Sequence, residues 1–274
     1  MSYLVLARKW RPQFFEDLIG QEHVSQTLKN AILADRVHHA FLFTGARGVG
    51  KTSAARIFAK ALNCQQGPTT EPCGECPSCV EITASQGIDV FEIDGASNTG
   101  VDDIRELREN IRYLPSTSRY KIFIIDEVHM LSINAFNALL KTLEEPPEHA
   151  KFILATTEPH KIPVTILSRC QRFDFRKINA GLVADRLRYI VGQEKVEISD
   201  QGLAMIARSG GGSMRDAQST LDQVIAFCGE QVSDEDLQAL LGLVDRRLLL
   251  ETVEAVIERD GRRVLSVIKR VDEH

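Results

Sequence analysis

The sequence predicts an α/β protein with a parallel sheet, followed by a smaller all-α part. Short apolar runs alternate with amphipathic helical patterns over the first two-thirds of the chain. The runs are too uniformly apolar for a sheet with one wet face, as in Ile122-Phe123-Ile124-Ile125, and parallel strands covered on both faces have this composition. After Asn179 the strand patterns stop, which indicates that a helical domain follows.

Five strands, with amphipathic helical stretches between them, are expected in the first part, residues 1–178. The predicted strands are Ala40–Thr44, Asp89–Ile93, Lys121–Asp126, Lys151–Thr156 and Arg172–Phe175. The predicted helices are Ser53–Leu62, Val101–Arg112 and Asn134–Leu143, each with helical periodicity. This alternation is typical of a sheet that lies between two layers of helices.

The remainder of the chain is expected to be helical. Its predicted helices are Ala180–Gln193, Ser199–Arg208, Ser213–Phe227 and Ser233–Leu241, with serines at three N-cap positions and glycines where helices stop. We assign residues 179–242 to a small helical domain. A further helical pair starts at Arg246 and is broken near Asp260-Gly261. Because two helices bury little by themselves, residues 243–274 are predicted to begin a third domain that is cut short.

Composition narrows the class of protein. The 274 residues are 43% hydrophobic and 26% charged, as expected of a soluble globular protein. A net charge of −5 argues against a protein that coats nucleic acid by bulk charge, so any DNA contact must be local. No apolar run approaches the roughly 18 residues of a membrane span, and the N-terminus has no secretory pattern. We therefore expect a cytoplasmic protein without a membrane partner.

The strongest motif is a glycine-rich loop between a predicted strand and a predicted helix. It reads Gly45-Ala46-Arg47-Gly48-Val49-Gly50-Lys51-Thr52. In such a loop the backbone N–H groups face phosphate oxygens, the lysine reaches the β- and γ-phosphates, and the threonine hydroxyl holds Mg²⁺. The start of the following helix adds its positive dipole end. A chance match is the alternative, but the strand and helix around the loop argue against it.

Two carboxylates end the most apolar strand, at Asp126 and Glu127. In a protein with a phosphate-binding loop, an acid at the end of a neighbouring strand holds Mg²⁺, which is the role expected of Asp126. Glu127 would then orient or deprotonate the attacking water. A polar strand end on the surface is the alternative. Together with Lys51, the pair favours hydrolysis of a nucleotide over binding alone.

Four cysteines cluster at Cys64, Cys73, Cys76 and Cys79. Four thiolates at short spacing can enclose a tetrahedral Zn²⁺ and leave no coordination position for water, so the predicted role is structural. Some iron–sulfur motifs begin in the same way but continue with a fourth cysteine, where this chain has Thr83. Reduced free thiols are the other alternative.

Two arginines and two threonines are weaker candidates. Arg169 follows a helical turn after Pro163, and Arg215 opens a helix of the second part. Either could stabilise γ-phosphate charge, although a lone arginine is more often a surface or ion-paired residue. Thr156 and Thr157, at a strand end, could bond a phosphate or the attacking water.

Taken together, the motifs resemble those of AAA+ ATPases. Gly45–Thr52, Ile122–His129, Ala155–Thr157, Ser168–Cys170 and Gly212–Asp216 match Walker A, Walker B, sensor 1, arginine-finger and sensor 2 motifs. The more specific resemblance is to the gamma/tau subunits of the bacterial DNA polymerase III clamp loader. It is carried by Ala7-Arg8-Lys9-Trp10-Arg11-Pro12, Ile19-Gly20-Gln21-Glu22-His23, the cysteine insert at 64–79, the extension of Walker B to Leu131, and 138–147.

The resemblance implies an ATPase domain, a helical lid and a collar that joins subunits into a pentameric ring. ATP would lie between the first two domains, with its base near Ala7, Arg11, Pro12 and Ile19. Arg169 would act in trans on a neighbouring subunit's ATP, and Arg215 in cis from the lid. The ATP-bound ring would open the sliding clamp and grip primer–template DNA, which the Asn98–Thr99 loop would face. With most of the collar missing, this chain by itself is expected to be monomeric or weakly associating.

Three other functions are less consistent with the sequence. A nucleotide-gated structural subunit without turnover conflicts with the intact set of Lys51, Asp126 and Glu127. A zinc-dependent nucleic-acid binder conflicts with the acidic charge and with the lack of a basic, aromatic-rich stripe. Another AAA+ DNA-remodelling ATPase, such as a branch-migration helicase, should lack the cysteine insert.

Overall fold

The computed structural model describes residues 4–97, 107, 109–242 and 246–272. By their internal contacts these residues divide into two compact units. The α/β unit consists of Trp10–Asn179 together with Gly212–Arg215. The helical unit consists of the described parts of Met1–Lys9, Ala180–Gly211 and Asp216–His274. The domain boundaries expected near residues 179 and 243 stay predictions.

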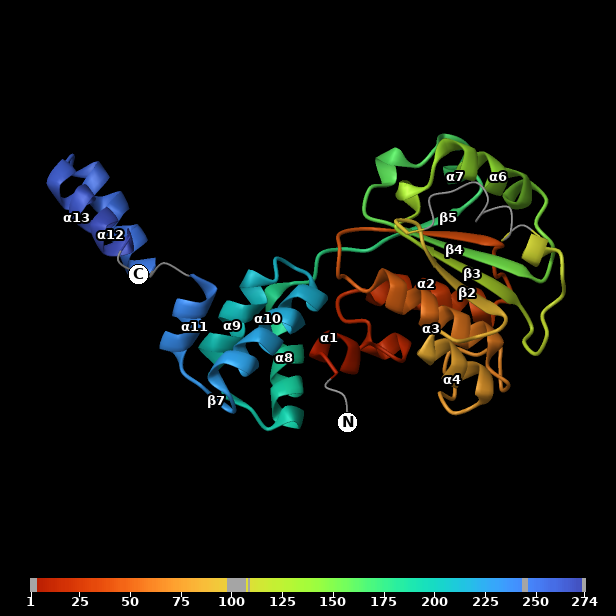
Figure 1. The fold of residues 1–274 in the computed structure, drawn as a ribbon, viewed down its shortest axis with the longest axis horizontal. Helices are drawn as coiled ribbons and strands as arrows, with labels where there is room; N and C mark the ends of the chain where they lie inside the picture. Colours follow the sequence, from red (N-terminus) through yellow and green to blue (C-terminus); the bar gives the residue numbers. More distant parts are fainter. Residues whose placement is uncertain (1–3, 98–106, 108, 243–245, 273–274) are drawn as a thin grey trace. The chain divides into compact units, whose positions relative to one another are not determined.

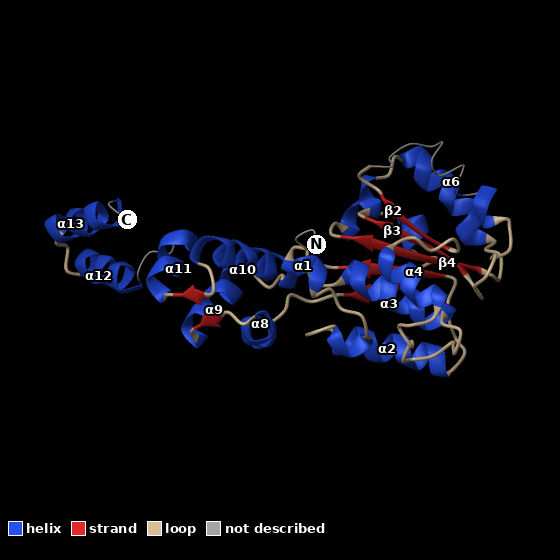
Figure 2. Ribbon diagram, turned by 60° about the horizontal axis from the view of Figure 1, so that its bottom comes forward, coloured by secondary structure: helices blue, strands red, loops and turns tan. Residues whose placement is uncertain are grey.

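A five-stranded parallel sheet is the framework of the α/β unit (Figure 2). Its strands are β1 (Ala40–Thr44), β2 (Val90–Asp94), β3 (Lys121–Asp126), β4 (Ala150–Thr156) and β5 (Gln171–Asp174), in the order β2-β3-β4-β1-β5. Every pair is parallel. The sequence-based strands are confirmed to within one residue at each end, and so is the parallel sheet.

Helices cover both faces of this sheet, which explains the uniformly apolar strands (Figure 1). On one face are α2 (Glu22–Leu33), α3 (Lys51–Asn63) and α4 (Pro77–Ala84); on the other are α6 (Ile133–Glu144) and α7 (Val164–Leu167). Alternate residues of β1 enter different cores, since side chains of a strand point to opposite faces. Phe41 and Phe43 pack with residues of α2 and α3, and Leu42 packs with residues of α6 and α7.

Local signals set the helix starts of this unit. Gly50 precedes α3 with a φ of 103°, a backbone conformation that suits glycine. Ser132 caps α6 by accepting a hydrogen bond from the Ala135 N–H at 3.2 Å. Of the predicted helix Val101–Arg112, the structure describes Leu107 and 109–112, and these are helical up to Ile111. The rest of that prediction, and the Asn98–Thr99 loop, lie outside the described residues.

The helical unit agrees with the predicted periodicity. Its described helices are α1 (Leu6–Lys9), α8 (Ala180–Glu194), α9 (Asp200–Ser209), α10 (Met214–Cys228, whose first two residues belong to the α/β unit), α11 (Asp234–Leu241), α12 (Arg246–Ile257) and α13 (Gly261–Asp272). Ser199 and Ser233 act as N-caps and accept hydrogen bonds from the N–H groups of Gly202 and Asp236. None of the described helices is long and apolar enough to cross a membrane.

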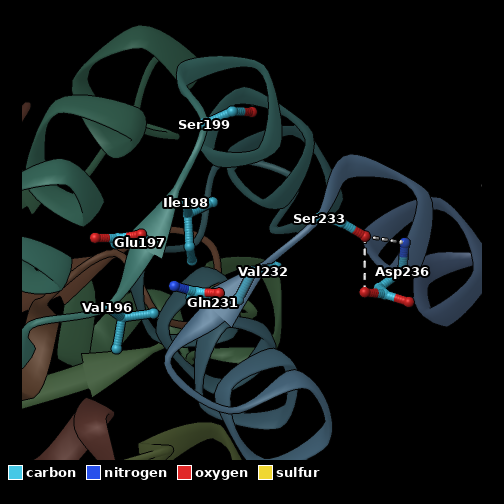
Figure 3. Close-up of a pocket in the computed structure, with 8 residues that line it drawn as sticks. All are labelled: Val196, Glu197, Ile198, Ser199, Gln231, Val232, Ser233 and Asp236. Carbon is cyan, nitrogen blue, oxygen red and sulfur yellow. Dashed lines mark hydrogen bonds between the residues drawn. The ribbon is translucent and has the colours of Figure 1, made fainter.

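The expectation that strands end after Asn179 is wrong in one detail. Glu197–Ile198 (β6) and Gln231–Val232 (β7) form a small parallel pair within the helical unit. Two residues are too few to show a strand period, so only the pairing over some 30 residues of sequence reveals them. An open pocket lies beside this pair, where the Ser233 hydroxyl caps α11 and donates to Asp236 at 2.7 Å (Figure 3).

Candidate nucleotide-binding and metal-binding sites

The glycine-rich loop joins the end of β1 to the start of α3, at the carboxyl edge of the sheet. Ligands of open parallel sheets bind at this edge. A Cβ on Gly45 would overlap the backbone oxygen of Phe175, and a Cβ on Gly48 would overlap the Ser213 hydroxyl. Both glycines also have positive φ, 144° and 71°. The loop therefore needs glycine at these positions to keep its backbone N–H groups available around a phosphate.

Lys51 is 5% exposed and lies within the curve of the loop. Its ammonium donates to the backbone oxygens of Gly45 at 2.9 Å and Ala46 at 2.8 Å. Burial lowers the pKa of Lys51, and the charges of Glu127 and Asp126 oppose that shift. The Lys51 ammonium has already lost most of its hydration. Binding a phosphate would therefore cost it little further desolvation.

The carboxylates at the end of β3 meet this loop from the other side. The Thr52 hydroxyl donates to Asp126 Oδ2 at 2.5 Å, so the two predicted Mg²⁺ ligands lie side by side. Asp126 Oδ1 accepts from the Glu127 N–H at 2.9 Å, which fixes the carboxylate plane. Glu127 has a left-handed backbone with a φ of 45°, an uncommon conformation for a non-glycine residue. Such strain is often found at functional sites.

The end of β4 lies between these two groups because β4 separates β3 from β1 in the sheet. Thr156 is fully buried there, and Thr157 follows it. The Thr157 hydroxyl donates to Glu127 Oε2 at 3.0 Å. The strand order thus brings both predicted threonines to the acidic strand end, and the hydrogen bond makes Thr157 a direct partner of Glu127.

Sequence reasoning assigned no role to His129, although the structure places it in this cluster. Its side chain is 6% exposed, and Nδ1 lies 3.0 Å from Thr156 Oγ1 and 3.4 Å from Glu127 Oε2. Nε2 lies 3.5 Å from Glu158 Oε1. No regular spacing links these residues, so periodicity could not find them. The sequence signal that could have indicated a role for His129 is its place two residues after Glu127. In the structure it lies in a short 3-10 helix there.

Arg215 reaches the phosphate-binding loop from a distant part of the sequence. Its backbone N–H donates to the Gly48 oxygen at 3.3 Å, and its Cβ lies 3.1 Å from where a Gly48 Cβ would be. Ile178 donates from its N–H to the Gly212 oxygen at 3.0 Å, which fastens this segment to the α/β unit. Arg215 is therefore beside the loop that it was predicted to serve.

Arg169 follows α7 and has a different setting. Its guanidinium donates to Glu144 Oε1 at 2.7 Å and to the Thr165 backbone oxygen at 2.7 Å. Arg169 is thus an ion-paired arginine whose partner lies at the end of α6. Its predicted action on a neighbouring subunit stays a prediction.

The residues expected around the adenine are divided between the two units. Arg11, Pro12 and Ile19 belong to the α/β unit, whereas Ala7 lies in α1 of the helical unit. Ile19 adjoins Leu18, whose side chain is the nearest neighbour of the Gly50 position at 3.5 Å. That contact brings the segment containing Ile19 close to the phosphate-binding loop. The adenine pocket as a whole stays a prediction.

A second site lies at the other end of α3, where Cys64 follows the helix. The Sγ atoms of Cys64, Cys73, Cys76 and Cys79 all lie within 4.8 Å of one another. Four sulfurs bound to one zinc would be about 3.8 Å apart, so a small contraction gives a tetrahedral site with four thiolate ligands. Backbone hydrogen bonds from Cys76 and Glu75 lower the pKa of Cys73 to about 6, and burial raises the pKa of Cys79. The cluster is compatible with zinc.

The fold and the loop chemistry define a P-loop nucleotide-binding protein of the AAA+ class. Solved structures of the Thermotoga maritima branch-migration motor RuvB share this fold. One superimposes with a TM-score of 0.62 over 92% of this chain and 81% of that chain, at 20% identity. At that identity the likeness concerns the fold alone.

Sequence comparisons give the family. A family model described as DNA polymerase III, delta subunit matches residues 20–179, and one described as the ATPase lid domain of the DNA polymerase III clamp loader subunit matches 182–230. The tau subunits of Escherichia coli and Bacillus subtilis are 52% and 51% identical over 98% and 99% of this chain. The gamma subunit from Buchnera aphidicola (subspecies Acyrthosiphon pisum) is 44% identical over 99% of this chain and 75% of its own length.

The chain belongs to the family of DNA polymerase III gamma and tau subunits. This confirms the resemblance carried by its motifs. The chain spans 42% and 48% of the E. coli and B. subtilis tau subunits, about half the length of those relatives.

Proposed function

We propose that this chain is the ATP-hydrolysing part of a clamp-loader subunit, which helps to load a sliding clamp onto primed DNA during replication. The observation that carries the proposal is the placement of Lys51, Thr52, Asp126 and Glu127 at one edge of the sheet. Hydrogen bonds and short sequence distances connect these four residues. Membership of the gamma and tau family supports the choice of clamp loading over other uses of ATP.

ATP would be held by the glycine-rich loop. The backbone N–H groups of 45–52 and the Lys51 ammonium would bind the phosphates, and the start of α3 would add its dipole. Thr52 and Asp126 would hold Mg²⁺, whose charge would offset that of the β- and γ-phosphates when it is bound. Arg215 would bind the same phosphates from the opposite side of the loop, and Ala7, Arg11, Pro12 and Ile19 would surround the base.

Glu127 would orient the attacking water and accept its proton. The Thr157 hydroxyl, 3.0 Å from Oε2, would hold the carboxylate in place for that role. Thr156 would contact the phosphate or the water from the end of β4. Arg169 would stabilise γ-phosphate charge in a neighbouring subunit, which requires it to leave its ion pair with Glu144.

The four cysteines would hold a structural zinc. All four ligand positions are taken by thiolates, so no water would be activated there and the metal would take no part in hydrolysis. Its effect would be to fix the loop of 64–79 onto the end of α3. One zinc per chain, measured by mass spectrometry of the native protein, is the expected stoichiometry.

The other clamp-loader subunits, the sliding clamp and primer–template DNA are the proposed partners, with a pentameric ring as the complete assembly. A cytoplasmic location is part of the same proposal. The likeness to RuvB concerns fold alone and does not favour branch migration, and the four-cysteine cluster is the feature expected to separate the two.

Steady-state ATP turnover tests the proposal. The complete protein, mixed with its loader partners, would be measured with and without sliding clamp and primed DNA, beside a Lys51→Ala variant. Stimulation that needs both clamp and primed DNA, and that is lost in the variant, is the expected result. Turnover indifferent to the clamp would contradict clamp loading and leave a P-loop ATPase of another kind. Absence of turnover under all conditions would favour a nucleotide-gated structural subunit.

A further inference from the structure

His129 joins three functional groups that come from two strand ends. Nδ1 lies within 3.4 Å of both the Thr156 hydroxyl and the Glu127 carboxylate, and Nε2 faces Glu158. The imidazole is nearly buried, with 6% of its side chain exposed, while the Glu127 and Glu158 side chains are 32% and 36% exposed. A buried ring with polar partners on both nitrogens has a fixed orientation.

The two ring nitrogens of His129 face different carboxylates, Nδ1 that of Glu127 and Nε2 that of Glu158. The hydrogen bond from Lys161 lowers the pKa of Glu158, and the charges of Lys161, His129 and His160 add to that effect, while burial opposes it. A carboxylate oxygen only accepts hydrogen bonds, so each ring nitrogen binds its carboxylate by donating an N–H. The Nδ1–H group also lies 3.0 Å from the Thr156 hydroxyl oxygen, which accepts a further hydrogen bond from the Glu158 N–H at 3.0 Å. Among the residues that the structure describes, Glu127 and Glu158 are the acidic side chains paired with the ring nitrogens.

The Glu127 carboxylate has two side-chain neighbours in this cluster, Thr157 and His129. Its backbone does not continue the strand, because φ is 45° at this residue. The direction of the side chain therefore depends on these neighbours. Thr157 alone would leave the carboxylate free to turn about that single hydrogen bond.

We infer that His129 is a positioning residue for hydrolysis, which holds the Glu127 carboxylate and the Thr156 hydroxyl in fixed relation through Nδ1, while Glu158 orients the ring through Nε2. The inference rests on the proposed function, because it needs Glu127 to be the group that activates water. In this role His129 would act through Glu127 and Thr156 and would not itself contact phosphate or water. Its loss would lower the rate of hydrolysis without weakening the binding of ATP.

The experiment uses the complete protein assembled with its partners, sliding clamp and primed DNA. kcat and KM for ATP, the Kd of a fluorescent ATP analogue and the melting temperature would be measured for His129→Ala, His129→Asn and His129→Gln. Asparagine offers a polar atom near the place of Nδ1, and glutamine one near the place of Nε2. His160→Ala is the matched control, because His160 also faces Glu158, at 3.5 Å, but its side chain is 74% exposed.

We expect His129→Ala to lower kcat about tenfold or more with Kd changed less than about twofold, as for loss of a residue that orients a functional group. His129→Asn should recover most of the loss, His129→Gln should recover little, and His160→Ala should match the unchanged protein. If His129→Ala lowers the melting temperature too far for assay, a comparison of kcat between His129→Asn and His129→Gln makes the same test.

Equal kcat values for the asparagine and glutamine variants would overturn the inference, since packing alone would then explain the site. So would a rise in Kd that accounts for the whole loss. Glu127→Gln separates this failure from failure of the proposed function. If Glu127→Gln abolishes turnover while His129→Ala leaves it intact, only the role of His129 is wrong. If Glu127→Gln retains turnover, the assignment of Glu127 fails and the inference fails with it.

Discussion

The two ends of α3 present contrasting sites on one helix. At the N-terminal end, Lys51 and Thr52 follow a glycine-rich loop and are hydrogen-bonded to loop oxygens and to Asp126. At the C-terminal end, Cys64 begins a cluster of four sulfurs that face one another. The first site has donors and acceptors that a phosphate can engage, and the second is complete in itself. One helix would thus support a nucleotide-binding site at its start and a structural site at its end, because the side chains at the two ends differ in chemistry.

The difference shows that proximity of reactive side chains does not by itself indicate catalysis. The four sulfurs of the cysteine cluster lie within 4.8 Å of one another, yet four thiolates around a zinc would leave no coordination position for a substrate. The proposed phosphate-binding site depends instead on backbone N–H groups and on charge. We therefore expect substitutions at the N-terminal end of α3 to affect turnover, and those at the C-terminal end to affect stability.

Lys51→Ala should have the largest effect. Loss of the ammonium removes charge stabilisation of the transferring phosphoryl group, and we expect turnover to fall about a thousandfold. The melting temperature should change little, because burial of the charged lysine already costs free energy, as its lowered pKa indicates. ATP turnover and thermal unfolding of the assembled protein would measure both.

Lys60→Met is the matched control for that lysine, since Lys60 lies near the other end of the same helix. Its ammonium donates to Gln13 O at 2.8 Å and Gln13 Oε1 at 2.9 Å, in a site 2% exposed. Burial lowers the pKa of Lys60 as well, but methionine would fill the space and leave both Gln13 oxygens without a donor, whereas alanine at Lys51 leaves room for water. The variant should therefore keep its turnover and lose stability. A large loss of turnover at Lys60 with stability unchanged would break the contrast between the two ends of α3.

Disruption of the proposed zinc site should have the next largest effect. We expect Cys76→Ser to lower the free energy of unfolding by about 3 kcal/mol, and the melting temperature by roughly 5–10 °C. Turnover at 25 °C should stay within about twofold, because the cysteine cluster and the glycine-rich loop lie at opposite ends of α3. Calorimetry, bound zinc and ATPase rate would be compared, with Cys228→Ser as the control. A hundredfold loss of turnover in a folded, zinc-free protein would show that the two sites are coupled.

Two glycines with similar φ angles allow the glycine-rich loop to be compared with the cysteine insert. Gly48 and Gly74 have φ of 71° and 74°, so alanine brings a similar backbone penalty of about 1–2 kcal/mol at each. An added Cβ would overlap Ser213 Oγ at Gly48, whereas at Gly74 it would lie 3.7 Å from Phe14. Gly48→Ala should therefore cost about 1–3 kcal/mol more in stability and weaken ATP binding.

Chemical denaturation and the Kd of ATP would measure this pair. Gly74→Ala should bind ATP as the unchanged protein does. Equal losses of stability in the two variants would mean that the backbone conformation alone sets the cost of each substitution. The close approach of Ser213 to the loop would then have no energetic consequence.

Glu144→Gln should have the smallest effect. The ion pair between Glu144 and Arg169 is partly exposed, so its loss should change stability by less than about 1 kcal/mol. Arg169 would no longer have to leave a carboxylate in order to reach a neighbouring subunit's phosphate. We expect turnover of the assembled ring to rise up to about fivefold, measured against Glu145→Gln as control. A fall of similar size would show that Glu144 holds Arg169 in its working position.

Much of this protein could be predicted from local sequence. Strand ends such as Thr44, Asp126 and Thr156 agree with the structure because apolar runs and polar strand ends are local patterns. The short pair of β6 and β7 was missed because neither strand is long enough to have a period. Histidine spacing likewise carried no information about His129.

The sequence by itself determined the element types, the glycine-rich loop, the acidic end of β3 and the cysteine cluster. Each depends on residues close together in the chain, where spacing and residue type are enough to indicate structure. The tertiary structure decided that β4 lies between β3 and β1, that His129 meets both Thr156 and Glu127, and that Arg215 approaches Gly48. These contacts form because the sheet order and the packing of both its faces bring distant segments together, and no local pattern encodes that order.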